Sequence, residues 1–254
     1  MKFPKLRIGE LTAPIPIIQG GMGIGISLSG LAGAVAREGA IGVISAAQPG
    51  FEESDFRSDT TCANCRALAY HLKKARETAP NGILGVNIMT KGFSYSDYAK
   101  CAVKNGADII FSGAGLPADL PSYVKNTKTK IAPIISSSRA CRVLLKLWEH
   151  HHQTTADLVV IEGPKAGGHL GYSREDIKRY EHQGYEKEIK EILSVVRTFE
   201  EKFNKKSPSF SGVACLTKMT LPAVSHWDSP ACKWQPALLQ QRNVMLLKPL
   251  RKCI

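Results

Sequence analysis

The segment with the clearest capacity for chemistry surrounds His169, in the run Ala-Gly-Gly-His-Leu-Gly at residues 166–171. An imidazole changes its charge near neutral pH, and flanking glycines leave it accessible to a ligand. Both properties suit a general base. A short apolar run at residues 156–162 precedes the histidine, so we expect His169 to follow the carboxyl end of a strand.

Two further segments carry polar or glycine residues next to an apolar run. The glycine-rich run at residues 19–25 follows the apolar residues 15–18, and glycines there let backbone amides approach a ligand closely. Asn87 lies inside the apolar run at residues 83–89, where a buried amide needs hydrogen-bond partners from the backbone or from a polar ring. The residues alone leave both interpretations of Asn87 open.

The elements that must position these residues alternate regularly. We expect strands at residues 15–20, 42–45, 83–89, 107–112, 130–136 and 156–162. We expect helices at residues 29–38, 64–78, 94–105, 118–125, 139–151 and 185–204. Six βα units predict an α/β protein that forms an incomplete (β/α)8 TIM barrel, whose active site lies at the carboxyl ends of its strands. A doubly wound sheet is the alternative, but the strand that ends at Ser45 lacks the acidic ribose partner of a dinucleotide site.

Composition excludes several other classes of protein. The 254 residues are 43% hydrophobic, enough for a substantial core, and we identify no transmembrane segment and no signal peptide. Seven scattered cysteines do not form a disulfide framework, which favours a reducing, cytoplasmic location. The net charge of +12 is spread along helix-like segments without interleaved aromatics, so we expect no nucleic-acid partner and no membrane partner. Composition does not determine the oligomeric state.

Two clusters with metal-ligand spacing have simpler explanations. Cys62 and Cys65 have the spacing of a redox or zinc pair, but no second pair follows and the segment opens a helix. The three histidines at residues 150–152 close a helix, where cationic side chains interact favourably with the helix dipole. We therefore expect no metal site.

Four motifs in this order and spacing resemble one known family. They are Pro-Ile-Ile-Gln-Gly-Gly-Met at 16–22, Gly-Val-Asn-Ile-Met at 85–89, Ser-Gly-Ala-Gly-Leu-Pro at 112–117 and Ala-Gly-Gly-His-Leu-Gly at 166–171. Over residues 6–206 the chain resembles the nitronate monooxygenases, formerly called 2-nitropropane dioxygenases. The resemblance implies an FMN-dependent TIM barrel that oxidises alkyl nitronates with molecular oxygen.

The resemblance also implies roles for individual residues. His169 matches the catalytic histidine, which takes the acidic α-proton of a nitroalkane. Flavin contacts are implied for two side chains, for two glycines that approach through their backbone, and for two glycines of the loop that packs on the flavin: Met22, Asn87, Gly20, Gly21, Gly167 and Gly168. A flavin-dependent enoyl-acyl carrier protein reductase shares the fold and the Ala-Gly-Gly-His motif, so both activities remain open.

The resemblance ends abruptly after Lys206, and the composition changes there. Residues 207–254 contain six basic residues and one acid, which gives +5 of the net +12. When the last base of each codon is joined to the first two bases of the next, permitted codon choices allow residues 230–239 to read as the missing family motif Gly-Val-Gln-Met. We therefore divide the chain into a barrel portion, residues 1–206, and a frameshifted tail, residues 207–254, which we expect to be irregular. An inactive gene product is accordingly a third possibility.

Overall fold

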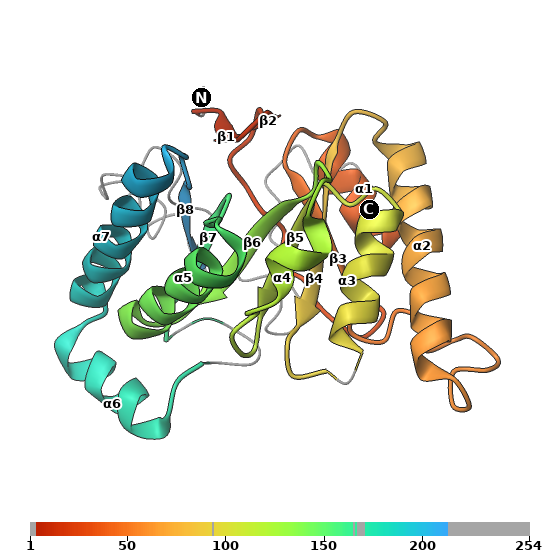
Figure 1. The fold of residues 1–254 in the computed structure, drawn as a ribbon. Coiled ribbons are helices and arrows are strands. Elements are labelled where there is room, and N and C mark those ends of the chain that lie inside the picture. The colour runs from red at the N-terminus through yellow and green to blue at the C-terminus, as the bar shows by residue number, and fades with distance from the viewer. Residues whose placement is uncertain (1–3, 93, 165, 167–170, 213–254) are drawn as a thin grey trace.

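A parallel sheet of six strands forms the centre of the computed structural model, which describes residues 4–92, 94–164, 166 and 171–212 (Figure 1). The strands follow one another in chain order, β3 to β8, without a crossover in strand order. Their bounds are β3 Ile41–Ser45, β4 Ile83–Met89, β5 Ile109–Gly113, β6 Lys130–Ile135, β7 Val159–Glu162 and β8 Ser209–Gly212. Sequential parallel strands joined by helices are the construction of a (β/α)8 barrel, here seen as a half-barrel.

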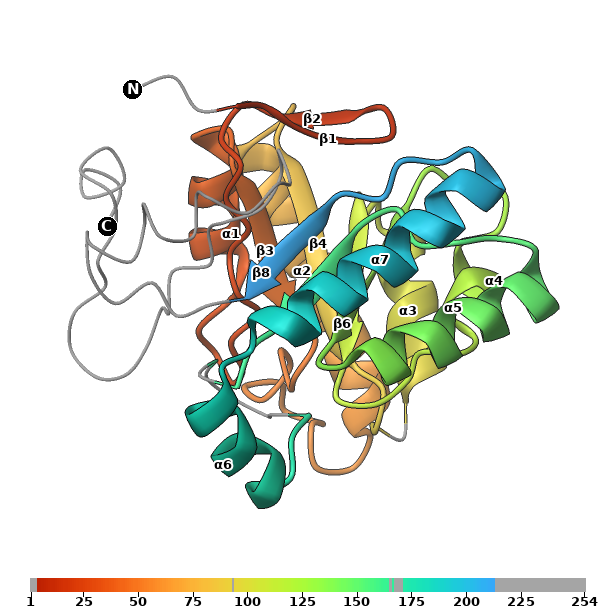
Figure 2. The same ribbon diagram turned by 90° about the vertical axis from the view of Figure 1, so that its left-hand side faces the viewer.

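Helices cover the outer face of the curved sheet (Figures 1 and 2). Their bounds are α1 Ser29–Arg37, α2 Thr60–Thr78, α3 Tyr95–Lys104, α4 Leu120–Val124, α5 Ser138–His152, α6 Arg174–Gln183 and α7 Glu186–Phe203. Asp59 and Ser137 cap α2 and α5 by accepting hydrogen bonds from Cys62 N and Ala140 N. No helix within the described ranges is both long and apolar enough to cross a membrane.

Strand residues alternate between two hydrophobic clusters. In β3, Val43 belongs to a cluster inside the curved sheet, whereas Ile44 belongs to a larger cluster between the sheet and the helices. In β5, Ile109 and Ile110 divide in the same way. Because successive strand side chains point to opposite faces, a strand buried on both faces requires an apolar residue at nearly every position. The continuous apolar runs of the sequence therefore specify this barrel-like arrangement.

A short antiparallel hairpin precedes the sheet and was not expected from the sequence. Its strands are β1 Leu6–Ile8 and β2 Leu11–Ala13, and both Leu6 and Ile8 are buried in the inner cluster. Glu10 in the hairpin turn pairs with Lys130, the first residue of β6, at 2.7 Å. The hairpin thus covers the amino-terminal edge of the sheet and leaves its carboxyl edge for the site.

The expected α/β barrel is confirmed, with corrections at three elements. Residues 15–20 form only one parallel bridge, between Ile18 and Ile41, instead of a full strand. Pro16 has no amide hydrogen to donate, which limits the pairing of this segment. The helix α6 was not expected, because its ten residues have no apolar face.

The third correction concerns the start of the segment expected to be irregular. Ser209–Gly212 form β8, which pairs in parallel with β7 over four residues, so the outer edge of β7 is covered. Phe210 is 2% exposed and belongs to the inner cluster, which explains why this short polar sequence still forms a strand. Residues 213–254 lie outside the described part of the chain.

Candidate functional site

The glycine-rich run after Ile18 lies against β3 and β4 at the carboxyl edge of the sheet. A Cβ atom added to Gly21 would lie 2.3 Å from the Cβ of Asn87 and 2.9 Å from its Oδ1. Only a residue without a side chain fits this approach, so the sequence of the loop and the position of Asn87 depend on each other. The structure therefore brings together Gly20, Gly21, Met22 and Asn87, four of the residues predicted to contact a flavin.

Asn87 lies in β4, and its backbone is hydrogen-bonded whereas its side chain is not bonded to any described residue. Its backbone pairs in register with Ser45 and Phe111, and its carbonyl accepts a hydrogen bond from Ala46 N at 2.9 Å. The half-buried side-chain amide makes no hydrogen bond to another residue in the described ranges. Of the two interpretations left open by the sequence, this geometry favours an amide available to a ligand.

The next two loops complete this edge of the sheet. Thr90, directly after β4, donates both its amide and its hydroxyl to the carbonyl of Gly113 at 2.9 Å. Ser112 Oγ donates to Ile88 O at 3.2 Å and lies 2.8 Å from the hydroxyl of Tyr95. These hydrogen bonds join the ends of β4 and β5 to each other next to Asn87.

The predicted base lies on a loop of which the structure describes only the two ends. His169, Gly167 and Gly168 are outside the described residues, so their predicted roles stay predictions. The loop begins after Glu162 at the end of β7, and the chain is described again from Gly171. Gly171 N donates to Glu162 Oε2 at 3.3 Å, and Ser136 Oγ donates to Gly171 O at 3.2 Å. These contacts hold the second end of the loop beside β6 and β7.

Two tyrosines reinforce the same end of the loop. The hydroxyls of Tyr172 and Tyr185 each contact both Ser136 O and Glu162 O, with Tyr185 at 2.8 and 3.0 Å. Each hydroxyl has one proton to donate, so the two tyrosines together can donate one hydrogen bond to each of the two carbonyl oxygens. Burial raises the pKa of both phenols above the ordinary value, so the protons stay in place at neutral pH.

Tyr180 completes an aromatic cluster with these two residues. Its ring centroid lies 5.1 Å from that of Tyr185 and 5.7 Å from that of Tyr172, in edge-to-face orientation. Since Tyr180 belongs to α6, the cluster attaches this otherwise polar helix to the sheet. Sequence reasoning missed these roles of Tyr172, Tyr180 and Tyr185, and the only signal was the position of Tyr172 next to the glycine-histidine motif.

The remaining clusters considered from the sequence lie on helices. Cys62 and Cys65 occupy the first turns of α2, and burial raises the pKa of Cys65 to about 12, which disfavours the thiolate that metal binding or redox chemistry requires. His150, His151 and His152 form the last turn of α5, as expected.

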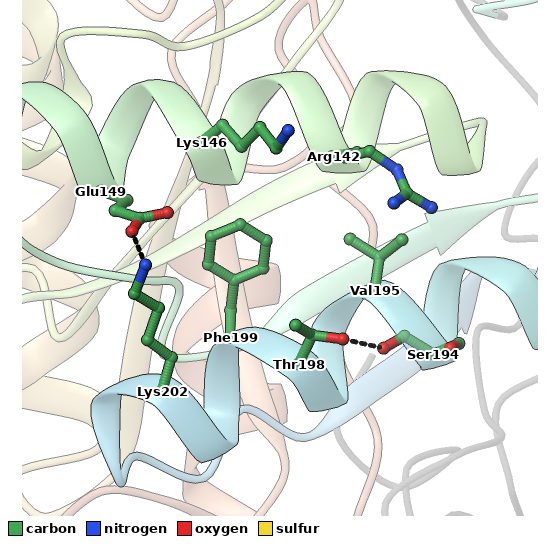
Figure 3. A pocket seen from close by; sticks show the side chains of 8 residues that line it. All are labelled: Arg142, Lys146, Glu149, Ser194, Val195, Thr198, Phe199 and Lys202. Atoms are coloured by element: carbon green, nitrogen blue, oxygen red, sulfur yellow. Dashed lines mark hydrogen bonds and ion pairs between the residues drawn. The ribbon is translucent and has the colours of Figure 1, made fainter.

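The groove drawn in Figure 3 lies elsewhere, between two helices of the outer layer. It has a volume of about 270 Å³ and is lined by α5 and α7 residues, including Arg142, Lys146 and Phe199. An ion pair between Glu149 and Lys202 crosses it. None of the predicted site residues that the structure describes lines this groove, which is separate from the edge that holds Asn87.

The fold defines the class of protein: a (β/α) barrel protein with a glycine-rich loop at the carboxyl ends of its strands. Comparison with known families then identifies the particular family. The model of the family described as nitronate monooxygenase matches residues 6–198. The chain therefore belongs to the nitronate monooxygenase family, which confirms the resemblance seen in the sequence.

Solved structures similar to this chain share its fold at low sequence identity. The nitroalkane oxidase from Streptomyces ansochromogenes is 17% identical with a TM-score of 0.63, and the match covers 86% of this chain and 64% of that one. FabK from Thermotoga maritima is 22% identical with a TM-score of 0.51, covering 78% and 51%. A mutant of the same FabK is 21% identical with a TM-score of 0.60, covering 85% and 60%. No curated protein matches the chain.

These matches also show a difference in length. The chain spans between about half and two thirds of the length of the solved structures it resembles. The family match over residues 6–198 includes Gly21 and Asn87.

Proposed function

We propose that the chain is an FMN-dependent nitronate monooxygenase, which oxidises alkyl nitronates or nitroalkanes with molecular oxygen. The observation that carries the proposal is the contact between Gly21 and Asn87, where a glycine meets a half-buried amide that makes no hydrogen bond to the described residues, at the strand ends of a family member. This edge suits a flat polar ring, because the glycine-rich loop offers backbone amides and Asn87 supplies both donor and acceptor groups.

Within this proposal the residues divide into two sets. Gly20, Gly21, Met22 and Asn87 form the wall against which the ring system of FMN would lie, and Gly167 and Gly168 would close over it. FMN, when bound, supplies the capacity to take electrons from the substrate and to pass them to molecular oxygen. His169 removes the α-proton of a neutral nitroalkane, and the contacts from Gly171 to Ser136 and Glu162 support its loop.

The experiment that tests the activity is anaerobic mixing of the FMN-loaded protein with a preformed alkyl nitronate. We expect the yellow absorbance of the flavin to bleach and to return when oxygen is admitted. Bound FMN that stays oxidised in the presence of the nitronate would contradict the proposal.

A second candidate activity is flavin-dependent enoyl-acyl carrier protein reduction, which the shared Ala-Gly-Gly-His motif at residues 166–169 supports. It predicts that a reduced nicotinamide, with an enoyl thioester as acceptor, is oxidised in steady state. Turnover of the nicotinamide without nitronate bleaching would select this activity, and the reverse pattern would select the first.

We also propose that the segment from Ser207 arises from a shifted reading frame and weakens cofactor binding. In a TIM barrel the loops after the seventh and eighth strands commonly hold a cofactor phosphate. β8 takes the place of the seventh strand, but the family's glycine-rich turn does not follow it in the sequence. The nucleotide sequence across codons 200–215 tests this point directly.

A further inference from the structure

The side chain of Ser27 lies at the centre of a hydrogen-bond network beneath the glycine-rich loop. Its Oγ donates to Gly20 O at 3.1 Å and accepts from Met22 N at 2.9 Å and from Gln19 Nε2 at 3.0 Å. A hydroxyl has one donor and two acceptor sites, so these three contacts use its full capacity. Ser27 is completely buried, and water cannot replace a lost partner without entering the core.

Gln19 connects this network to the sheet. Its Nε2 also donates to Val43 O at 2.9 Å, and its Oε1 accepts from Val43 N at 3.3 Å. The side-chain amide thereby pairs with β3 as a neighbouring peptide group would, although Gln19 is 3% exposed and lies beyond the last bridge at Ile18. This pairing fixes where the glycine-rich loop leaves the sheet.

The backbone of Ser27 closes the loop and places it against the candidate site. Ser27 N donates to Met22 O at 2.9 Å, and Ser27 O accepts from Ser45 N at 2.9 Å. Ser45 is the register partner of Asn87 in the neighbouring strand. One residue therefore holds both ends of the turn at residues 22–27 and sets its distance from Asn87.

The network leaves backbone amides in the middle of the loop available to bind a ligand. The backbone N–H groups of five loop residues donate no hydrogen bond to any other described residue: Gly21, Gly23, Ile24, Gly25 and Ile26. A loop with this many unused donors keeps one shape only if other atoms fix it. The hydroxyl of Ser27 and the amide of Gln19 are the side-chain groups that do so.

We propose that Ser27, supported by Gln19, is the positioning residue that holds the loop at residues 20–26 in the shape that receives the flavin. This inference rests on the proposed function for the identity of the ligand. Ser27 itself is buried beneath the loop, so it acts through the backbone of Gly20 and Met22 and does not touch the ligand.

The test compares Ser27→Ala with Ser29→Ala in the full chain. Ser29 is also buried, and its hydroxyl lies 3.0 Å from His71 Nδ1 and makes no hydrogen bond to the described residues of the loop. We expect Ser27→Ala to raise the dissociation constant for FMN about tenfold or more, and Ser29→Ala to leave it within about twofold. Hydrogen exchange should accelerate at the amides of Met22 and Ser45 in Ser27→Ala alone.

Each outcome decides one of the two claims. Equal FMN affinities for Ser27→Ala and the parent would overturn this inference while leaving the proposed function intact. If the parent binds no FMN, the proposed function fails, and hydrogen exchange in the free protein then decides the positioning role: unchanged exchange at Met22 would overturn it. Should Ser27→Ala not fold, Gln19→Met, which removes the contacts to Ser27 and Val43 at similar side-chain length, provides the same comparison.

Discussion

Replacement of Gly21 by alanine tests whether the close approach of this residue to Asn87 shapes the cofactor site. The added Cβ would lie 2.3 Å from Asn87 Cβ and 2.7 Å from its Cγ. Carbon atoms in contact prefer a separation of about 3.5–4.0 Å, so the loop or Asn87 must move by about 1 Å or more. Over-packing of this kind costs about 1–3 kcal/mol, and a displacement of about 1 Å at a binding group can reduce function by up to about 100-fold.

We therefore expect Gly21→Ala to weaken FMN binding by at least about tenfold, which corresponds to about 1.4 kcal/mol. Titration of flavin fluorescence measures the affinity, and urea unfolding measures the change in the free energy of unfolding. Gly30→Ala is the matched control, because a Cβ at Gly30 meets no atom within 4 Å. The reasoning would be refuted if both variants bound FMN as tightly as the parent.

Three other predictions address the base, the tail and the tyrosines. His169→Asn should retain flavin but lose about 100-fold or more in rate with a neutral nitroalkane, and much less with a preformed nitronate; equal rates of variant and parent with the neutral compound would remove this role. Restoring the family reading frame after Lys206 should tighten FMN binding at least about 100-fold, about 2.7 kcal/mol, and raise the melting temperature; comparable affinities would contradict the loss of a phosphate site. Tyr185→Phe should lower the free energy of unfolding, measured in urea, by about 1 kcal/mol, because one half-buried carbonyl loses its donor, whereas Tyr180→Phe should cost less; equal costs would argue against a stabilising role for the hydrogen bonds from Tyr185 to Ser136 O and Glu162 O.

The sequence predicted the sheet well because burial on both faces leaves a strong pattern. The runs that contain β3 to β7 are largely apolar, and β3, β4 and β6 are followed by helices with an apolar stripe, α2, α3 and α5. The same pattern located the carboxyl ends of the strands, but Gly21 and Asn87 were assigned to one site by the family resemblance, before their contact was known.

The elements that the sequence did not predict depend on tertiary contacts. α6 has no apolar stripe; it begins with a capping box between Ser173 and Asp176 and is attached through Tyr180. β8 is four residues long and forms because β7 offers a free edge and the inner cluster accommodates Phe210. The role of Ser27 had no local signal, since its partners are brought together only by the turn at residues 22–27.

The central claim is that FMN binds at the carboxyl edge formed by the glycine-rich loop and β4. Hydrogen exchange of the full chain with and without saturating FMN measures the location directly. We predict slower exchange in residues 19–28 and 83–90, which include the unused amides of the loop and the strand that carries Asn87. Protection confined to the α5 and α7 residues that line the outer groove, or no protection at either place, would contradict the claim.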